Sequence, residues 1–141
     1  MLGIGNELRG DDAAGVLVAR LLSSKGKKLI SIEGGSAPEN FTGVIIKAAP
    51  SHVVIVDSAW MELEPGSIRM IEARSIDGAS FSTHTLPAGV LISYLKRSIE
   101  CEVITMGIEP KSTEFGARIS PEVKKAVRKL AEAISGAVRG R

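Results

Sequence analysis

The sequence is poor in cysteine and in aromatic residues. Cys101 is its only cysteine among 141 residues, which excludes an internal disulfide and a zinc site built from several thiolates. Aromatic residues make up 4% of the chain, so a core has to be built mainly from Val, Ile, Leu and Ala. A single cysteine also fits a reducing compartment.

Excess charge of one sign and long apolar runs are lacking as well. The formal net charge is +2, which predicts no general affinity for nucleic acid or for a membrane surface. No apolar run approaches the roughly 20 residues that a bilayer-spanning helix needs. Residues 1–6 have neither the basic start nor the long apolar stretch of a signal peptide. We therefore expect a cytoplasmic protein.

Hydrophobic residues, at 44%, and charged residues, at 24%, are present in the proportions of a folded chain, and we expect one domain over residues 1–141. Apolar patterns alternate between strand and helix. They predict strands at residues 2–5, 29–33, 53–57, 67–73 and 102–108. They predict helices from a capping Asp11 or Asp12 to about residue 24, from Pro38 to a closing Pro50, from Pro87, and from a capping Ser120 with residues 136–141 frayed.

Alternating strands and helices are typical of the α/β class. The pattern predicts a three-layer fold, in which a mostly parallel, twisted sheet of about five strands is covered by helices on both faces. The run at residues 53–57 has four β-branched residues followed by an acid, as in a strand buried on both faces. The expected inward residues are Val90, Leu91, Tyr94 and Leu95 in the third helix, and Val123, Ala126, Val127, Leu130, Ala131 and Ile134 in the last.

Sites in such folds lie beyond the carboxyl ends of the parallel strands. The segments 6–12, 33–36 and 57–58 follow the first three predicted strands, so Asp12 and Asp57 should converge there, with Asp11 and Glu33 nearby. His84 stands just before a helix start and can reach the same rim, whereas His52 precedes the third strand and belongs at the opposite rim. Two carboxylates and one imidazole suit a borderline divalent metal with open positions.

Each of these features also has an ordinary structural explanation. An aspartate after a strand is often a helix cap or a turn residue, and an isolated histidine is often a plain surface residue. Trp60 either packs in the core or anchors a protein partner beside the site. The basic side chains of the last helix form a solvated outer face or attract an acidic partner; they are Lys124, Lys125, Arg128 and Lys129.

Other catalytic motifs are absent from the sequence. The segment from Gly3 to Gly5 begins like a dinucleotide-binding loop, but Leu8 stands where the third glycine is needed. There is no Walker lysine motif, no H-E-x-x-H and no G-x-S-x-G elbow. Cys101 is expected at the rim opposite His84, which disfavours a cysteine nucleophile.

Several segments, in order along the chain, resemble the motifs of one family. Residues 3–15 read G-I-G-N-E-L-R-G-D-D-A-A-G and resemble G-x-G-N-x-L-x-G-D-[DE]-x-x-G, the opening signature of hydrogenase maturation proteases. Five further segments of this chain are similar to other blocks of that family. They are E-G-G-S at 33–36, V-D-S-A at 56–59, S-T-H-T-L-P at 82–87, G-I-E-P at 107–110 and I-S-P-E-V at 119–123. The first strand is shorter than in the family, and residues 63–67 match its hairpin only loosely.

The resemblance implies a nickel-dependent endopeptidase. Its substrate would be a [NiFe]-hydrogenase large-subunit precursor, whose C-terminal extension is removed once nickel, carried by the precursor, is in place. The family's metal-binding positions, which are also catalytic, map onto Asp12, Asp57 and His84, and Zn or Cd could substitute in vitro.

The remaining expectations concern substrate contacts and other classes of function. The substrate-binding candidates are Asn6, Asp11, Glu33, Gly34, Gly35 and Trp60, and we expect a monomer. Backbone N–H groups of the two glycines, or Asn6, could stabilise an oxyanion. The alternatives are a non-enzymatic nickel carrier with the same three ligands and a partner-binding module without metal.

Overall fold

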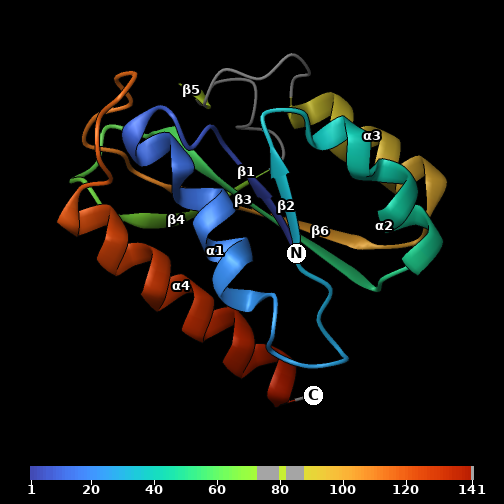
Figure 1. The fold of residues 1–141 in the computed structure, drawn as a ribbon. Helices are drawn as coiled ribbons and strands as arrows, with labels where there is room; N and C mark the ends of the chain where they lie inside the picture. The colour runs from blue at the N-terminus through green and yellow to red at the C-terminus, as the bar shows by residue number, and fades with distance from the viewer. Residues whose placement is uncertain (73–79, 82–87, 141) are drawn as a thin grey trace.

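The computed structural model describes residues 1–72, 80–81 and 88–140. Strands and helices alternate through most of the chain (Figure 1). The strands are β1 Leu2–Ile4, β2 Ile32–Gly35, β3 His52–Trp60, β4 Ile68–Ile71, β5 Ser80–Phe81 and β6 Glu102–Ile108. The α-helices are α1 Ala14–Leu22, α2 Thr42–Ala48, α3 Ala88–Ser98 and α4 Pro121–Arg139, with short 3₁₀ turns η1 Gly10–Ala13 before α1 and η2 Pro38–Phe41 before α2.

The sheet has the order β2-β1-β3-β6-β4. The first four of these strands run parallel, and β4 pairs antiparallel with β6 at the edge. The short β5 pairs antiparallel with the last two residues of β3, Ala59 and Trp60. The predicted α/β class with a mostly parallel sheet is confirmed, and the carboxyl ends of β1, β2, β3 and β6 share one rim.

Helices cover the sheet on both faces. Figure 1 shows α1 and α4 side by side, with α2 and α3 on the other side of the sheet. Side chains of β3 divide between two cores: Val53 and Ile55 pack with α2 and α3, whereas Val56 packs with α1 and α4. This alternation is the period of two expected of a strand buried on both faces. No helix in the described ranges is long and apolar enough to span a membrane.

The start of α1 approaches the sheet through two glycines. A Cβ atom built on Gly3 would lie 2.1 Å from the carbonyl oxygen of Gly15, and one built on Gly15 would lie 2.2 Å from the carbonyl oxygen of Val56. Backbone atoms leave no room for either methyl group. The two glycines therefore let η1 and α1 lie directly on β1 and β3, which places Asp12 at the rim.

The position of the second strand and the start of the first helix differ from the prediction. The second strand is Ile32–Gly35 rather than residues 29–33, because pairing with β1 joins Leu2 to Ile32 and Ile4 to Gly35. Neither Asp11 nor Asp12 caps a helix with its side chain; η1 and α1 have no side-chain cap. Both carboxylates make tertiary hydrogen bonds instead.

Helices α3 and α4 differ from the prediction in smaller ways. The inward residues of α3 are Leu91, Ile92 and Leu95, whereas Val90 and Tyr94 are about half exposed. The predicted cap of α4 is confirmed, since the Ser120 hydroxyl accepts a hydrogen bond from the Val123 N–H, and so is its inward stripe. The expected fraying after residue 135 is wrong, because α4 continues to Arg139.

Candidate active site

Three loops at the carboxyl rim carry most of the predicted site residues. The loop after β1 lies against the end of β2, where the Gly5 N–H donates a 3.0 Å hydrogen bond to the carbonyl oxygen of Gly35. A hollow of about 290 Å³ opens between them, and Asn6, Glu33 and Gly35 are among its lining residues. The structure thus brings three of the six predicted substrate-binding residues to one cavity.

Asp12 is held between this loop and the end of β3. Its carboxylate is 2% exposed, and its Oδ2 accepts a 3.0 Å hydrogen bond from the Asn6 N–H. Its Oδ1 accepts a 2.7 Å hydrogen bond from the hydroxyl of Ser58. Asp57, the neighbour of Ser58 in β3, is also buried, at 1% exposure. Two buried acids therefore lie at this rim, one in η1 after β1 and the other in β3.

The third predicted ligand, His84, lies in the segment 82–87, outside the described residues. Within the described ranges, His, Cys, Asp and Glu side chains form no group of three that could hold a metal ion. The three-ligand set Asp12, Asp57 and His84 therefore stays a prediction, with two of its members at one rim.

Asp11 joins the loop after β1 to the chain before α4 and is not among the residues that line the hollow. Its Oδ2 accepts hydrogen bonds from the N–H groups of Lys111 (2.8 Å) and Ser112 (3.3 Å) and from the Ser120 hydroxyl (2.8 Å). Its Oδ1 accepts a 2.6 Å hydrogen bond from the Ser120 N–H. With 1% exposure and four donors, this carboxylate is placed to hold the loop rather than to meet solvent.

The last two residues of β2, Gly34 and Gly35, are both positions that favour glycine. Gly34 is buried, and a Cβ there would lie 2.8 Å from a methyl carbon of Leu2 and 3.0 Å from the Gly3 carbonyl oxygen. Gly35 has a φ of +61°, which favours glycine. The Asn6 side-chain oxygen accepts a 2.9 Å hydrogen bond from the Leu8 N–H, so that side chain also stabilises its own loop.

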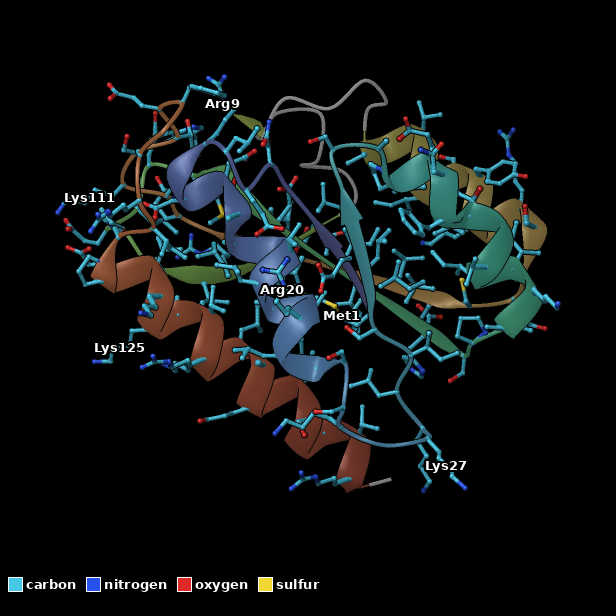
Figure 2. All side chains as sticks on the ribbon, viewed as in Figure 1. Met1, Arg9, Arg20, Lys27, Lys111 and Lys125 are labelled. Atoms are coloured by element: carbon cyan, nitrogen blue, oxygen red, sulfur yellow. The ribbon has the colours of Figure 1, made fainter. Side chains whose placement is uncertain are left out.

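Arg20 joins the acids on either side of the hollow. Its guanidinium donates to both oxygens of Glu7, at 2.6 and 3.1 Å, and to both oxygens of Glu33, at 2.8 and 3.2 Å. Figure 2 labels Arg20 on the exposed side of α1. The hydrogen bonds to Arg20 hold the pKa of Glu7 below its usual value, and the same contacts raise the pKa of Arg20. One guanidinium therefore makes charge-assisted hydrogen bonds to two carboxylates and ties the loop after β1 to β2.

Trp60 lies at the carboxyl end of β3, whereas Cys101 lies just before the start of β6. Trp60 is the last residue of β3 and is 45% exposed, so it is not part of the core. Cys101 precedes β6, at the rim opposite Asp12, and burial raises the pKa of its thiol. A protonated thiol far from the site agrees with the prediction that it is no nucleophile.

Sequence reasoning missed one further residue of the rim, Glu109. The buried carboxylate of Glu109 accepts hydrogen bonds from the N–H groups of Met61 (2.6 Å) and Leu63 (3.3 Å), and so fixes the loop after β3. Glu109 directly follows β6, so the rule that selected Asp57 applied to it equally. Ser58 was placed at the rim together with Asp57, but its hydrogen bond to Asp12 was not predicted.

Comparison with known proteins identifies the family of the chain. A family profile described as hydrogenase maturation protease matches residues 16–137. The chain belongs to that family. A Methanocaldococcus jannaschii protein named for the same activity is 40% identical over 139 residues, which cover 92% of this chain and 82% of the relative. The Escherichia coli hydrogenase 3 maturation protease is 37% identical over 138 residues, with coverage of 96% and 88%.

Solved structures of the hydrogenase maturation protease family have the same fold. The crystal structure of a [NiFe] hydrogenase maturation protease from Thermococcus kodakarensis superposes with a TM-score of 0.89 at 34% identity, covering 98% of this chain and 90% of that one. The chain is accordingly a hydrogenase maturation endopeptidase that processes a [NiFe]-hydrogenase large subunit.

Proposed function

We propose that this endopeptidase removes the C-terminal extension of a large-subunit precursor only after nickel has been inserted, and that it recognises the nickel through Asp12, Asp57 and His84. The observation that carries the proposal is the hydrogen bond of 2.7 Å between Asp12 and Ser58, because it ties one predicted ligand to the neighbour of the next. The nickel belongs to the substrate, since the precursor carries it.

The chemistry of the donors supports this division. Carboxylate oxygen and imidazole nitrogen are ligands for a borderline divalent ion, and thiolates of the precursor would supply the softer half of the coordination sphere. A precursor without nickel offers nothing for the two buried carboxylates to bind. Recognition of the ion thereby acts as a checkpoint that rejects the unloaded precursor.

The hollow beside Asp12 is the place for the peptide. Its lining includes Asn6, Glu33 and Gly35, and the end of β2 offers backbone groups to an extended chain. A bound nickel ion would polarise the scissile carbonyl or lower the pKa of a water. Asp12 and Asp57 hold the ion beside that bond, and Asp11 acts on the site only by fixing the loop.

The direct test measures removal of the extension from nickel-loaded precursor by mass spectrometry. Asp12→Ala, Asp57→Ala and His84→Ala should each abolish the shortened product, while Glu132→Ala, an exposed acid on α4, should leave it unchanged. Circular dichroism establishes that each variant is folded. Unchanged processing by all three site variants would end the assignment.

A second test concerns affinity for free nickel. Three protein ligands, without the precursor's thiolates, should bind the ion with micromolar or weaker affinity in calorimetry. Nanomolar binding by the isolated protein would instead favour the second candidate, a nickel carrier. A carrier would also release no shortened subunit from the precursor. We further propose a cytoplasmic monomer, which light scattering coupled to gel filtration tests for its oligomeric part.

A further inference from the structure

A second, larger hollow lies beside the candidate active site. It has a volume of about 640 Å³ and is bounded by η1 and α1 on one side and by the chain that leads into α4 on the other. We call it the basic groove; its apolar lining includes Ala13, Leu17, Ala117 and Ile119, and its cations are Arg118 and Lys124. Its volume is in the range of binding sites that enclose a ligand or a peptide side chain.

The charge of the basic groove is uncompensated. In the part of the chain that the structure describes, the side chains of Arg118 and Lys124 have neither a hydrogen bond nor an ion pair, whereas Lys111 nearby pairs with Glu122 at 3.3 Å. Glu7 is the one acid among the lining residues, and Arg20 already binds both of its oxygens. Figure 2 shows Arg9, Lys111 and Lys125 along the same side of the molecule.

The walls of the basic groove are held together. The carboxylate of Asp11 binds Lys111, Ser112 and Ser120 on the opposite wall. The Gly116 N–H donates a 2.8 Å hydrogen bond to the Leu8 carbonyl oxygen, which joins the two walls again. A cavity fixed by its own backbone can bind a partner with little loss of conformational entropy.

The basic groove and the hollow lined by Asn6, Glu33 and Gly35 are neighbours, because Glu7 lines both. A polypeptide held at the candidate active site therefore has a second surface within reach along its length. Apolar side chains suit the floor and a carboxylate suits the two free cations, which is the arrangement of an apolar centre with a charged rim.

We propose that the basic groove is an exosite for a segment of the large-subunit precursor that carries an acidic side chain next to apolar ones. The inference rests on the proposed function, in that the occupant is part of the same substrate. The basic groove adds affinity and orientation for the precursor, and the chemical step stays with the residues at Asp12.

The test reverses the charges of the basic groove. Arg118→Glu with Lys124→Glu should raise the KM for nickel-loaded precursor about tenfold, with kcat unchanged and a weaker salt dependence of kcat/KM. The matched control is Lys125→Glu with Lys129→Glu, which changes the net charge by the same amount at exposed positions of α4 outside the groove lining. The control should change KM by less than twofold.

Binding is measured separately from cleavage. Calorimetry with nickel-loaded precursor uses the Asp12→Ala background, with and without the charge reversals. If wild-type protein cleaves normally and the groove and control variants bind equally, the exosite is wrong and the proposed function stands. If wild-type protein cleaves nothing and the groove variant alone loses affinity, the proposed function is wrong and the exosite stands. A fall in kcat at constant KM also overturns the exosite.

Discussion

Asp11 and Ser120 are bound to each other twice, although 109 positions separate them in the sequence. The Ser120 N–H and hydroxyl donate to the two oxygens of the carboxylate at 2.6 and 2.8 Å. The same serine caps α4, since its hydroxyl accepts from the Val123 N–H. One pair of residues thus connects the loop that carries Asp12 to the start of the last helix.

Removing the carboxylate of Asp11 should therefore destabilise the fold. Asp11→Ala leaves buried N–H donors without an acceptor, and we expect the free energy of unfolding to fall by about 3 kcal/mol. Equilibrium urea denaturation measures it. Glu114→Ala, an exposed acid of the same segment, is the control and should cost less than about 0.5 kcal/mol. Equal losses for the two variants would show that the four hydrogen bonds contribute little.

Ser58→Ala should lower processing more than stability. The variant removes the hydroxyl that orients Asp12, and loss of a hydrogen bond to a metal-binding residue typically costs 10- to 100-fold in activity. We expect processing of nickel-loaded precursor to slow about tenfold, with a stability loss of about 1 kcal/mol. Ser135→Ala removes a buried hydroxyl from α4 and should leave the rate unchanged. An unaltered rate in Ser58→Ala would mean that Asp12 needs no such orientation.

Two glycine substitutions should change stability in opposite directions. A methyl group at Gly15 would lie 2.2 and 2.3 Å from the carbonyl oxygens of Val56 and Ile4, so Gly15→Ala should cost at least about 3 kcal/mol. Gly136 lies in α4 with nothing within 4 Å of an added Cβ. Gly136→Ala should stabilise the protein by about 0.5–1 kcal/mol because alanine favours a helix. Thermal unfolding compares both variants, and a stable Gly15→Ala would refute the tight approach of α1 to the sheet.

The titration of Glu7 should depend on Arg20. Hydrogen bonding to Arg20 lowers the pKa of Glu7 in the folded state, so the contact stabilises the fold above the ordinary glutamate pKa. That contribution decreases as the pH falls below the ordinary glutamate pKa of about 4.3 and is lost once the pH has passed through the lowered folded pKa. Carboxyl-carbon NMR should show the pKa of Glu7 returning to its ordinary value in Arg20→Met. The same midpoint in both proteins would contradict the ion pair.

The sequence alone predicted the helices and strands whose formation depends only on residues a few positions apart. β6 was predicted at its observed bounds, Glu102–Ile108, and the cap and inward stripe of α4 are as the sequence indicates. Each depends on neighbours within a few positions: β-branched residues in the strand, and Ser120 with Pro121 at the helix start. β2 was misplaced because two glycines resemble a strand end, while pairing with β1 selects Ile32–Gly35.

Long-range partners explain what the sequence left open in the candidate site. The rule that sites follow strand ends selected Asp12 and Asp57, and both are buried at that rim. It does not distinguish these acids from Asp11, whose partners lie at Lys111, Ser112 and Ser120. Arg20 reaches Glu7 and Glu33 across 13 positions in each direction, a spacing that no helix or strand period indicates.

The link between the first loop and Ser120 also bears on synthesis of the protein. A nascent chain that has emerged only as far as Glu109 contains Asp12 and Asp57, but it has no donors to seat the carboxylate of Asp11. The loop that carries Asp12 gains the hydrogen bonds between Asp11 and Ser120 only after the segment around Ser120 has left the ribosome. All four hydrogen bonds to Asp11 are therefore absent from a nascent chain that stops at Glu109, and the last two form only once Ser120 is available.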